Sequence, residues 1–304
     1  MKKTPVKWLA LGLCLLPLLG AGSCRVKTTE RLPPEEVLPL QTATLEELVA
    51  RLERQAAAVT SINAETELRP TTGSAYSGVI EQYHDVKAFV LGERRTSAGG
   101  GNRRHIRVLG QAPILRKNIF DMVADEEQFR IYLPTKNKFI VGPTRLEQRS
   151  EKPIENLRPQ HLFEAIFLEA PAPEAMLLLE ENEWGGRRYY ALTELVRGSE
   201  GRPVLRRHWW FERSRLELVR VQRFDAEGRL LADIHYGQWR EVDGIAYPHD
   251  IELVRPQEDY RLRIIVKKLT LNEPVPASRF RLERPEGVEL VELKEAEPAQ
   301  GEGR

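Results

Sequence analysis

Apolar residues recur at helical spacing in one long segment, which starts near residue 44. Thr44-Leu-Glu-Glu47 at its front matches a capping box, in which a threonine and a glutamate three residues later satisfy free backbone N–H groups at a helix start. The pattern predicts one helix over about residues 44–59, with Glu46, Glu53 and Arg54 facing solvent. The apolar positions of this helix are Leu45, Leu48, Val49, Leu52, Ala56 and Val59.

After residue 60 the apolar positions follow a period of two, which is typical of strands. A glycine-rich run at 97–102 predicts a mobile hairpin loop, and a second, shorter helix is expected at His161–Phe167 after a long connection over 144–159. Strands in the second half follow one another with short turns, so the sheet is predicted to be antiparallel. The predicted strands lie near 62–68, 105–109, 119–124, 128–133, 139–142, 175–181, 187–196, 203–212, 215–224, 230–239, 248–255 and 259–271.

The alternation gives this sheet one apolar and one polar face. In the run 259–271 the even-numbered residues from Tyr260 to Val266 are apolar, whereas Arg261, Arg263 and Lys267 lie on the other side. Two helices of about four and two turns are too few to cover such a surface. The sequence therefore predicts a mainly β (α+β) fold whose sheet either curls and fills its interior with side chains or leaves an apolar cavity. Other apolar faces are formed by Phe129, Ile131 and Leu133, and by Leu230, Ala232, Ile234 and Tyr236.

Residues 1–23 have the three parts of an export signal. A positive front with Lys2, Lys3 and Lys7 precedes an apolar stretch, Trp8–Leu19, and then the small residues 20–23. The apolar stretch has twelve residues, whereas a membrane-spanning helix needs roughly 20. This segment is therefore interpreted as a cleaved leader.

Cys24 follows the leader directly. Ala21-Gly22-Ser23-Cys24 resembles the lipobox of bacterial lipoproteins, in which the cysteine thiol is acylated and becomes the new N-terminus. The other cysteine, Cys14, lies within the leader, so Cys24 has no partner for an internal disulfide in the mature chain. Arg25 stands where enterobacterial lipoproteins retained in the inner membrane favour Asp, and by that resemblance the outer membrane is the expected destination. The polar, proline-bearing residues 24–43 predict a tether.

Charge and composition argue against nucleic acid as a partner. The formal net charge is +1, and without the three lysines of the leader 43 basic residues face 45 acidic ones. The pairs Arg94-Arg95, Arg103-Arg104 and Arg206-Arg207 are short and far apart, and are interpreted as solvated strand ends. Nucleic-acid binding is therefore not expected.

Chemistry-bearing motifs are not evident. The six histidines do not form an H-E-x-x-H zinc helix, and no metal site, catalytic group or cofactor is predicted. Gly198-Ser-Glu-Gly201 lacks the G-x-S-x-G spacing of a nucleophile elbow and predicts a hairpin turn. Trp209 and Phe211 should point to one side of a strand and Trp210 to the other, where His208 and Trp210 form a core or rim pair rather than a ligand site.

Three stretches in order along the chain carry a family resemblance. The first is the capped helix followed by Ser61-Ile-Asn-Ala-Glu-Thr66, and the second is the hairpin Ile119–Pro134, with an acidic turn before an aromatic strand. The third is Ala277–Val288, preceded by Asp243-Gly-Ile-Ala-Tyr-Pro248. Together they resemble the outer-membrane lipoprotein carrier and receptor (LolA/LolB-like) family over most of residues 44–290.

This resemblance implies an incomplete antiparallel β-barrel, or half-barrel, with a helical lid enclosing a hydrophobic cavity. Cys24 makes the chain more similar to the anchored receptor than to the soluble carrier. The Arg-Pro element of the carrier has no counterpart at Asp85-Val-Lys87, so no arginine role is transferred. The expected organisation is a lipoprotein signal peptide (1–23), a tether (24–43), a half-barrel domain (44–290) and a disordered acidic tail (291–304).

The expected function is non-enzymatic. The chain is expected to be anchored through acylated Cys24, with palmitate among the acyl groups, to face the periplasm, and to bind lipid or lipoprotein acyl chains during transfer to the outer membrane. The residues that line the lipid site cannot be assigned from the strand pattern. The alternative is an envelope protein-interaction or stress-sensing module on the same scaffold, with the loop 144–159 and the glycine-rich loop as partner surfaces.

Overall fold

The chain folds mainly into strands, as its period-two segments predict. The computed structural model describes residues 38–74, 78–96, 102–112, 117–144, 156–198 and 201–293. The two helices of this part are α1 (Leu45–Ala58) and α2 (Pro159–Ile166). The strands are β1 (Ser61–Ser74), β2 (Val79–Gln82), β3 (Val86–Thr96), β4 (Asn102–Gln111), β5 (Asn118–Ala124), β6 (Gln128–Leu133), β7 (Lys138–Pro143), β8 (Met176–Trp184), β9 (Arg187–Arg197), β10 (Pro203–Glu212), β11 (Glu217–Phe224), β12 (Leu230–Val242), β13 (Ile245–Arg255), β14 (Tyr260–Leu271) and β15 (Glu289–Glu292).

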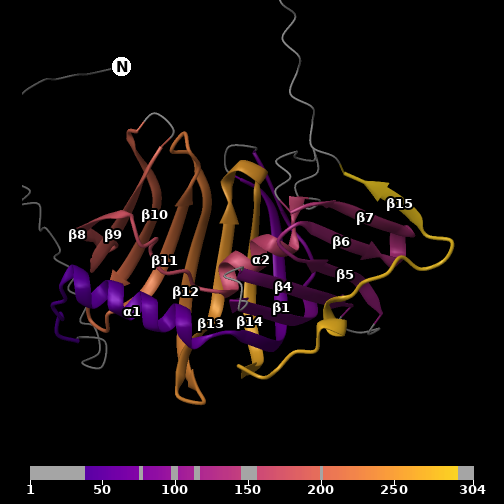
Figure 1. Cartoon of the computed structure of the whole chain (residues 1–304), viewed down its shortest axis with the longest axis horizontal. Helices are drawn as coiled ribbons and strands as arrows, with labels where there is room; N and C mark the ends of the chain where they lie inside the picture. Colours follow the sequence, from indigo (N-terminus) through magenta and orange to yellow (C-terminus); the bar gives the residue numbers. More distant parts are fainter. Residues whose placement is uncertain are drawn as a thin grey trace, which may run out of the picture. The chain divides into compact units, whose positions relative to one another are not determined.

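All these strands belong to one sheet, in the order β15-β7-β6-β5-β4-β3-β1-β14-β13-β12-β11-β10-β9-β8, with β2 paired to β1 beside this path. The pairs are antiparallel except for β15 and β7, which run parallel. The sheet curls, but its end strands β15 and β8 do not pair with each other, so it is an open half-barrel rather than a closed barrel (Figure 1).

The predicted separation of faces is confirmed along the middle of the sheet. In β14, Tyr260, Leu262 and Ile264 are buried, whereas Arg261 and Arg263 are exposed. The register pairs Leu68 of β1 with Ile264, so the apolar row continues from β14 into β1. The inner side chains of the sheet and of both helices form one continuous apolar core.

The outer, convex face carries ladders of ion pairs. Arg263 of β14 pairs with Asp250 of β13 at 2.5 Å, and Arg220 of β11 pairs with Asp233 of β12 at 2.6 Å. The two members of each pair stand diagonally opposite one another on neighbouring strands, where opposite charges support strand pairing. This face is therefore solvated, as the sequence predicts.

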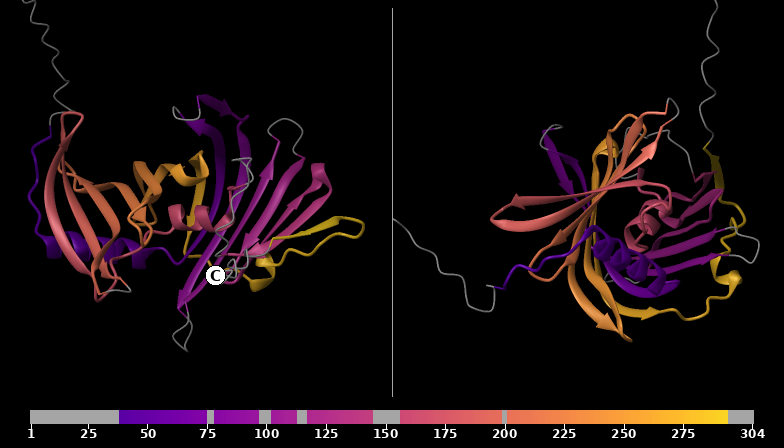
Figure 2. Two further views of the ribbon diagram at one scale, coloured as in Figure 1. Left: turned by 90° about the horizontal axis from the view of Figure 1, so that it is seen from above. Right: turned by 60° about the vertical axis from the view of Figure 1, so that its left-hand side comes forward.

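Both helices lie on the concave side of the sheet (Figures 1 and 2). Helix α1 begins with the predicted capping box: the Glu47 N–H donates to Thr44 Oγ1 at 3.3 Å, and the Thr44 N–H donates to Glu47 Oε2 at 2.8 Å. Helix α2 begins at Pro159, a residue suited to the first helical turn. None of the helices in the described ranges is both long and apolar enough to cross a membrane.

The structure adds detail at both ends of the domain. The region after 271 contains a strand, β15, which adds to the edge of β7 and extends past the expected boundary at 290. The end of the expected tether is also bound to the domain, because the Gln41 N–H donates to Arg213 O at 2.8 Å. The leader, Cys24, most of the 97–102 loop, residues 145–155 and the end of the tail lie outside the described residues.

Candidate functional site

The concave face of the half-barrel is the candidate site, and α1 and α2 cover it. We call these two helices the lid. Leu48 and Leu52 of α1 and Leu162 and Phe163 of α2 are buried in the apolar core, and Phe167 after α2 is 1% exposed. The lid thus occupies part of the apolar sheet surface for which the sequence predicts too little helical cover. A ligand on this surface would have to displace lid side chains.

Arg94 of β3 ties both lid helices to the sheet. Its Nη1 donates to Leu168 O, two residues after α2, at 2.7 Å. Its Nη2 donates to Val59 O at 3.2 Å and to Ala56 O in the last turn of α1. One guanidinium therefore satisfies carbonyls at the end of α1, where the helix leaves such groups free, and a carbonyl of the segment after α2.

Four arginines converge on one carboxylate on the inner side, and we call them the arginine cage: Arg94, Arg104, Arg207 and Arg223. Glu169, three residues after α2, lies 3.1 Å from Arg104 Nη1 and 3.1 Å from Arg207 Nη1. In sheet order six strands separate β4, which carries Arg104, from β10, which carries Arg207. Glu169 therefore links the two sides of the curled sheet.

Burial and charge compete in the cage. Burial raises the pKa of Glu169, but Arg223, Arg207, Arg104 and Arg94 outweigh it, and the pKa lies below its usual value of 4.5. Burial lowers the pKa of Arg207, against the pull of nearby carboxylates. Glu169 and Arg207 both retain their charges near neutral pH, so Glu169 is held as an anion.

Two further carboxylates complete the cluster. Glu164 of α2 pairs with Arg223 at 2.6 Å. Glu194 of β9 is fully buried, lies 3.3 Å from Arg207 Nε, and accepts a hydrogen bond from the Ala172 N–H at 2.7 Å. Four guanidinium groups thus face three carboxylates.

A second set of polar contacts, made by tyrosines of β12, β13 and β14, holds α2 to the sheet. The Tyr236 hydroxyl donates to Ala165 O and the Tyr247 hydroxyl donates to Ile166 O, each at 3.1 Å. His161 Nδ1 and the Tyr260 hydroxyl are hydrogen-bonded at 2.6 Å. Burial is the main cause that raises the pKa of all three tyrosines and lowers that of His161, so these groups are uncharged at neutral pH.

The arginine pairs were misinterpreted from the sequence. Neighbouring strand residues point to opposite faces, so Arg206 is exposed whereas Arg207 points inward with 13% of its side chain exposed. Arg94 and Arg104 reach the lid in the same way. The interpretation of these pairs as solvated strand ends is therefore wrong for Arg94 and Arg207. The sequence signal that could have shown this is the position of these arginines within runs that alternate between inward and outward residues.

The aromatic residues of β10 lie on the faces that the sequence predicts. Trp209 and Phe211 are buried in the core, and Trp210 and His208 lie half-buried on the other face, where Trp210 Nε1 donates to Gln222 Oε1 at 3.2 Å. Within the described ranges, no three His, Cys, Asp or Glu side chains are grouped as a metal site. Cys24, the predicted lipid anchor, lies outside those ranges.

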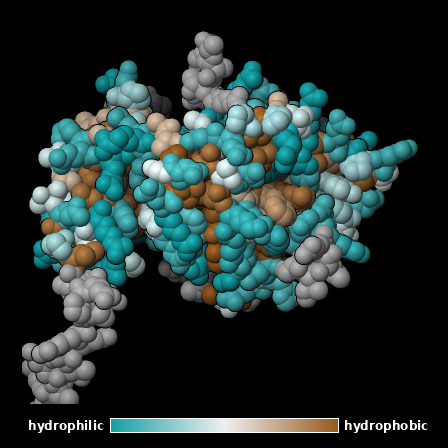
Figure 3. All heavy atoms as spheres, turned by 90° about the horizontal axis from the view of Figure 1, so that it is seen from below, coloured by the Kyte–Doolittle hydropathy of each residue, from teal (hydrophilic) through white to brown (hydrophobic). Residues whose placement is uncertain are grey.

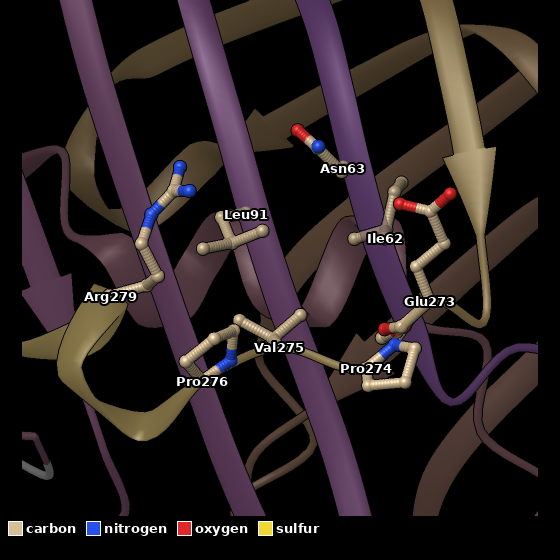
Figure 4. Close-up of a pocket in the computed structure, with 9 residues that line it drawn as sticks. Ile62, Asn63, Leu91, Glu273, Pro274, Val275, Pro276 and Arg279 are labelled. Atoms are coloured by element: carbon tan, nitrogen blue, oxygen red, sulfur yellow. The ribbon is translucent and has the colours of Figure 1, made fainter.

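A pocket of about 120 Å³ lies between β1, β3 and the segment after β14 (Figure 4). Asn63, Leu91, Pro274, Val275 and Arg279 are among its lining residues. Pockets that hold small molecules are typically about 300–1,000 Å³, so this one is too small for an acyl chain. This pocket is therefore not the candidate site.

The geometry defines a class of protein: an open antiparallel half-barrel whose apolar concave face is covered by a helical lid. Solved structures with this architecture include a DUF1329 family protein from Desulfovibrio piger (16% identity, TM-score 0.52) and an outer-membrane lipoprotein-sorting protein domain from Vibrio parahaemolyticus (11%, 0.51). Each match covers 77% of this chain and 94% of the other. A LolA superfamily protein from Nitrosomonas europaea matches at 13% identity and a TM-score of 0.48, over 79% of this chain and 99% of the other.

The chain shares the fold of the DUF1329 protein and of the lipoprotein-sorting domain, which confirms the predicted half-barrel. No protein-family model matches the sequence, and no curated protein matches it. Identities of 11–16% show a shared fold and leave the function to the chemistry of the site itself.

Proposed function

We propose that this protein binds the acyl chains of a lipid or lipoprotein on the concave face of its half-barrel, beneath the lid, and passes them on without catalysis. The observation that carries the proposal is the apolar inner face, which is continuous from β6 to β9 and is covered, within the described residues, by α1 and α2. The lipoprotein-sorting description of a structure with the same fold supports the same function.

The energetics of acyl-chain burial fit such a site. Each methylene buried contributes roughly 0.8 kcal/mol, so a chain of about 16 carbons gains on the order of 12 kcal/mol before the lid is displaced. The ligand would replace apolar contacts of α2, whose buried face is short: Leu162, Phe163, Ala165 and Ile166. Displacing these side chains from the core would offset part of the gain, which favours reversible rather than permanent binding.

We also propose that Cys24 is the acylated N-terminus, carrying palmitate or a similar chain, and that residues 24–40 connect it to the domain. Stable anchoring requires more than one acyl chain, which a lipoprotein cysteine provides. The half-barrel would then face the periplasm from the outer membrane. Mass spectrometry of the mature N-terminus tests this part separately: an unmodified Cys24 would contradict it.

The binding proposal is tested with a Cys24→Ser variant of the full chain, which carries no acyl group of its own. Lipids that copurify are extracted and identified by mass spectrometry, and binding of a fluorescent C16 fatty acid is titrated. We expect co-extracted acyl lipid or saturable binding that unlabelled palmitate reverses. A lipid-free protein that does not bind the probe would refute the proposal.

A protein-interaction role on the same scaffold is the second candidate, and the edge strand β8 favours it. Met176, Leu178 and Trp184 project from one face of β8 and are 57%, 45% and 69% exposed. Among the described strands β8 pairs only with β9, so its outer edge is open to an added strand. Apolar residues also reach the surface in several patches in the view of Figure 3.

Crosslinking in cells distinguishes the two candidates. A photoreactive residue in place of Leu178 should capture a protein if β8 is a docking edge, whereas one in place of Phe163 should capture lipid if the lid covers an acyl site. Recovery of a single protein partner from Leu178 with no lipid from Phe163 would favour the interaction role.

A further inference from the structure

The end of α2 and the segment after it together combine apolar rings with a charged group, as an amphiphilic ligand does. Phe163 and Phe167 stack with their ring centroids 4.4 Å apart, and Glu169 stands two residues further on. Arg94 lies over the Phe167 ring at 5.5 Å and Arg104 lies over the Phe163 ring at 5.9 Å. A buried apolar body therefore ends in a carboxylate, and the sheet binds both parts.

The arginine cage is suited to an anion that is larger than one carboxylate. Arg207 Nε and Nη1 are buried and make no hydrogen bond to any described residue, although Glu194 and Glu169 lie within ion-pair distance. Phosphate and carboxylate groups offer oxygens that match guanidinium donors in pairs. Donors without hydrogen bonds at the centre of the cage are thus available to a ligand.

The rim of the cage is accessible from solvent. The Glu169 side chain is 22% exposed and the Arg104 side chain is 42% exposed. Withdrawal of Glu169 would leave four guanidinium groups with Glu164 and Glu194, an excess of two positive charges. Such an excess in a partly buried site favours the entry of an anion.

We propose that the arginine cage (Arg94, Arg104, Arg207 and Arg223) is the binding site for the anionic headgroup of an acyl-chain ligand, and that Phe163, Phe167 and Glu169 are its internal substitute. On binding, the ligand headgroup replaces the Glu169 carboxylate and its chain replaces the two rings. This inference rests on the proposed function and assigns the ligand class: single or multiple acyl chains with a carboxylate or phosphate headgroup.

Competition between Glu169 and the headgroup predicts opposite effects of two substitutions. Glu169→Gln removes the competing charge and leaves the cage, so anionic ligands should bind more tightly. Arg207→Met removes the donors at the centre, so the preference for a charged headgroup should fall. A charge-assisted hydrogen bond contributes about 1.5–3 kcal/mol, which corresponds to a change of about tenfold or more in affinity.

The test uses the full chain with Cys24→Ser and a bound fluorescent C16 fatty acid. Displacement is measured with palmitate, hexadecyl phosphate, hexadecanol and inorganic phosphate. Glu252→Gln and Arg261→Met, an ion pair on the convex face at 3.4 Å, are the matched controls. Circular dichroism verifies folding, and Arg104→Gln, at the partly exposed rim, replaces Arg207→Met if that variant is unfolded.

The expected result is that palmitate and hexadecyl phosphate displace the probe at about tenfold lower concentration than hexadecanol does. The difference should increase in Glu169→Gln, nearly disappear in Arg207→Met and persist in both controls. Equal displacement by charged and neutral amphiphiles would overturn the headgroup site while supporting the acyl site. Displacement by inorganic phosphate at the same concentrations would overturn the amphiphile assignment in favour of a free-anion site. Failure of every compound, with no probe bound, would overturn the proposed function as well.

Discussion

Stability should decrease as the pH falls through 6.5 because His161 is buried as a neutral group. It lies in α2, hydrogen-bonded to the Tyr260 hydroxyl. Burial lowers its pKa well below the usual 6.5, and Arg255 of β13, Arg158 before α2 and Arg223 of β11 lower it further. Glu258 and Glu164 are the nearby carboxylates of the same region.

The sign and size of this effect follow from proton linkage. The unfolded chain takes up a proton on His161 near pH 6.5, whereas the folded chain does so only at much lower pH. The stabilisation is therefore complete above 6.5 and is lost progressively below it, until the folded pKa is reached. The loss is about 1.4 kcal/mol at pH 5.5.

Urea unfolding of the wild type and of His161→Gln at pH 7.5, 6.5 and 5.5 measures this contribution. Glutamine can still accept a hydrogen bond from Tyr260 but does not titrate, so the stability difference between the two proteins should shrink by about 1.4 kcal/mol from pH 7.5 to 5.5. His84→Gln, at an exposed position, should parallel the wild type. A difference that is constant within about 0.3 kcal/mol would refute the argument.

Three further substitutions test the lid and its packing. Arg94→Met removes the contacts that join both helices to β3, so it should lower the free energy of unfolding by about 2–4 kcal/mol and speed the entry of a fluorescent fatty acid. The control Arg263→Met, on the convex face, should lower the free energy of unfolding by about 1 kcal/mol or less. Equal effects of the two substitutions in both assays would count against the lid attachment. Thr44→Ala removes the capping box and should cost about 1 kcal/mol in thermal or urea unfolding, and an unchanged midpoint would contradict it. Gly92→Ala places a Cβ 2.7 Å from Phe167 Cε2 and should lower the free energy of unfolding by about 1–3 kcal/mol. In the control Gly237→Ala, the added Cβ meets no atom closer than 3.9 Å, so this substitution should be neutral or slightly stabilising. The reverse order of stabilities would be inconsistent with close packing of the lid.

The local elements of the fold could be predicted from the sequence because their signals are local. The capping box at Thr44 marks the start of α1, and alternation in 259–271 separates the faces of β14. β15 could not be predicted in this way. Its four residues, Glu289–Glu292, carry little pattern of their own, and their strand geometry depends on the free edge of β7.

The arginine cage was missed for a different reason. The residue types were visible, but which member of each Arg-Arg pair points inward depends on the strand register. Glu194 gave a usable signal: it follows Tyr190 and Leu192 on the inward side of β9 and is 0% exposed. A carboxylate at an inward position requires a buried cation. The convergence on Glu169 of residues from β4 and β10, which six other strands separate, could not be found without the curled sheet.

The pairing of β1 with β14 has a consequence for biogenesis. Each half of the sheet, β1 to β7 and β8 to β14, consists of neighbours in sequence and can zip up from local hairpins as it is synthesised. The seam between the halves joins Ile62 to Leu271, and closing a loop of some 200 residues opposes folding by about 5 kcal/mol. Until the final quarter of the polypeptide emerges, β1 therefore exposes an unsatisfied edge. The apolar inner face is thus completed only when β14 docks on β1, late in synthesis.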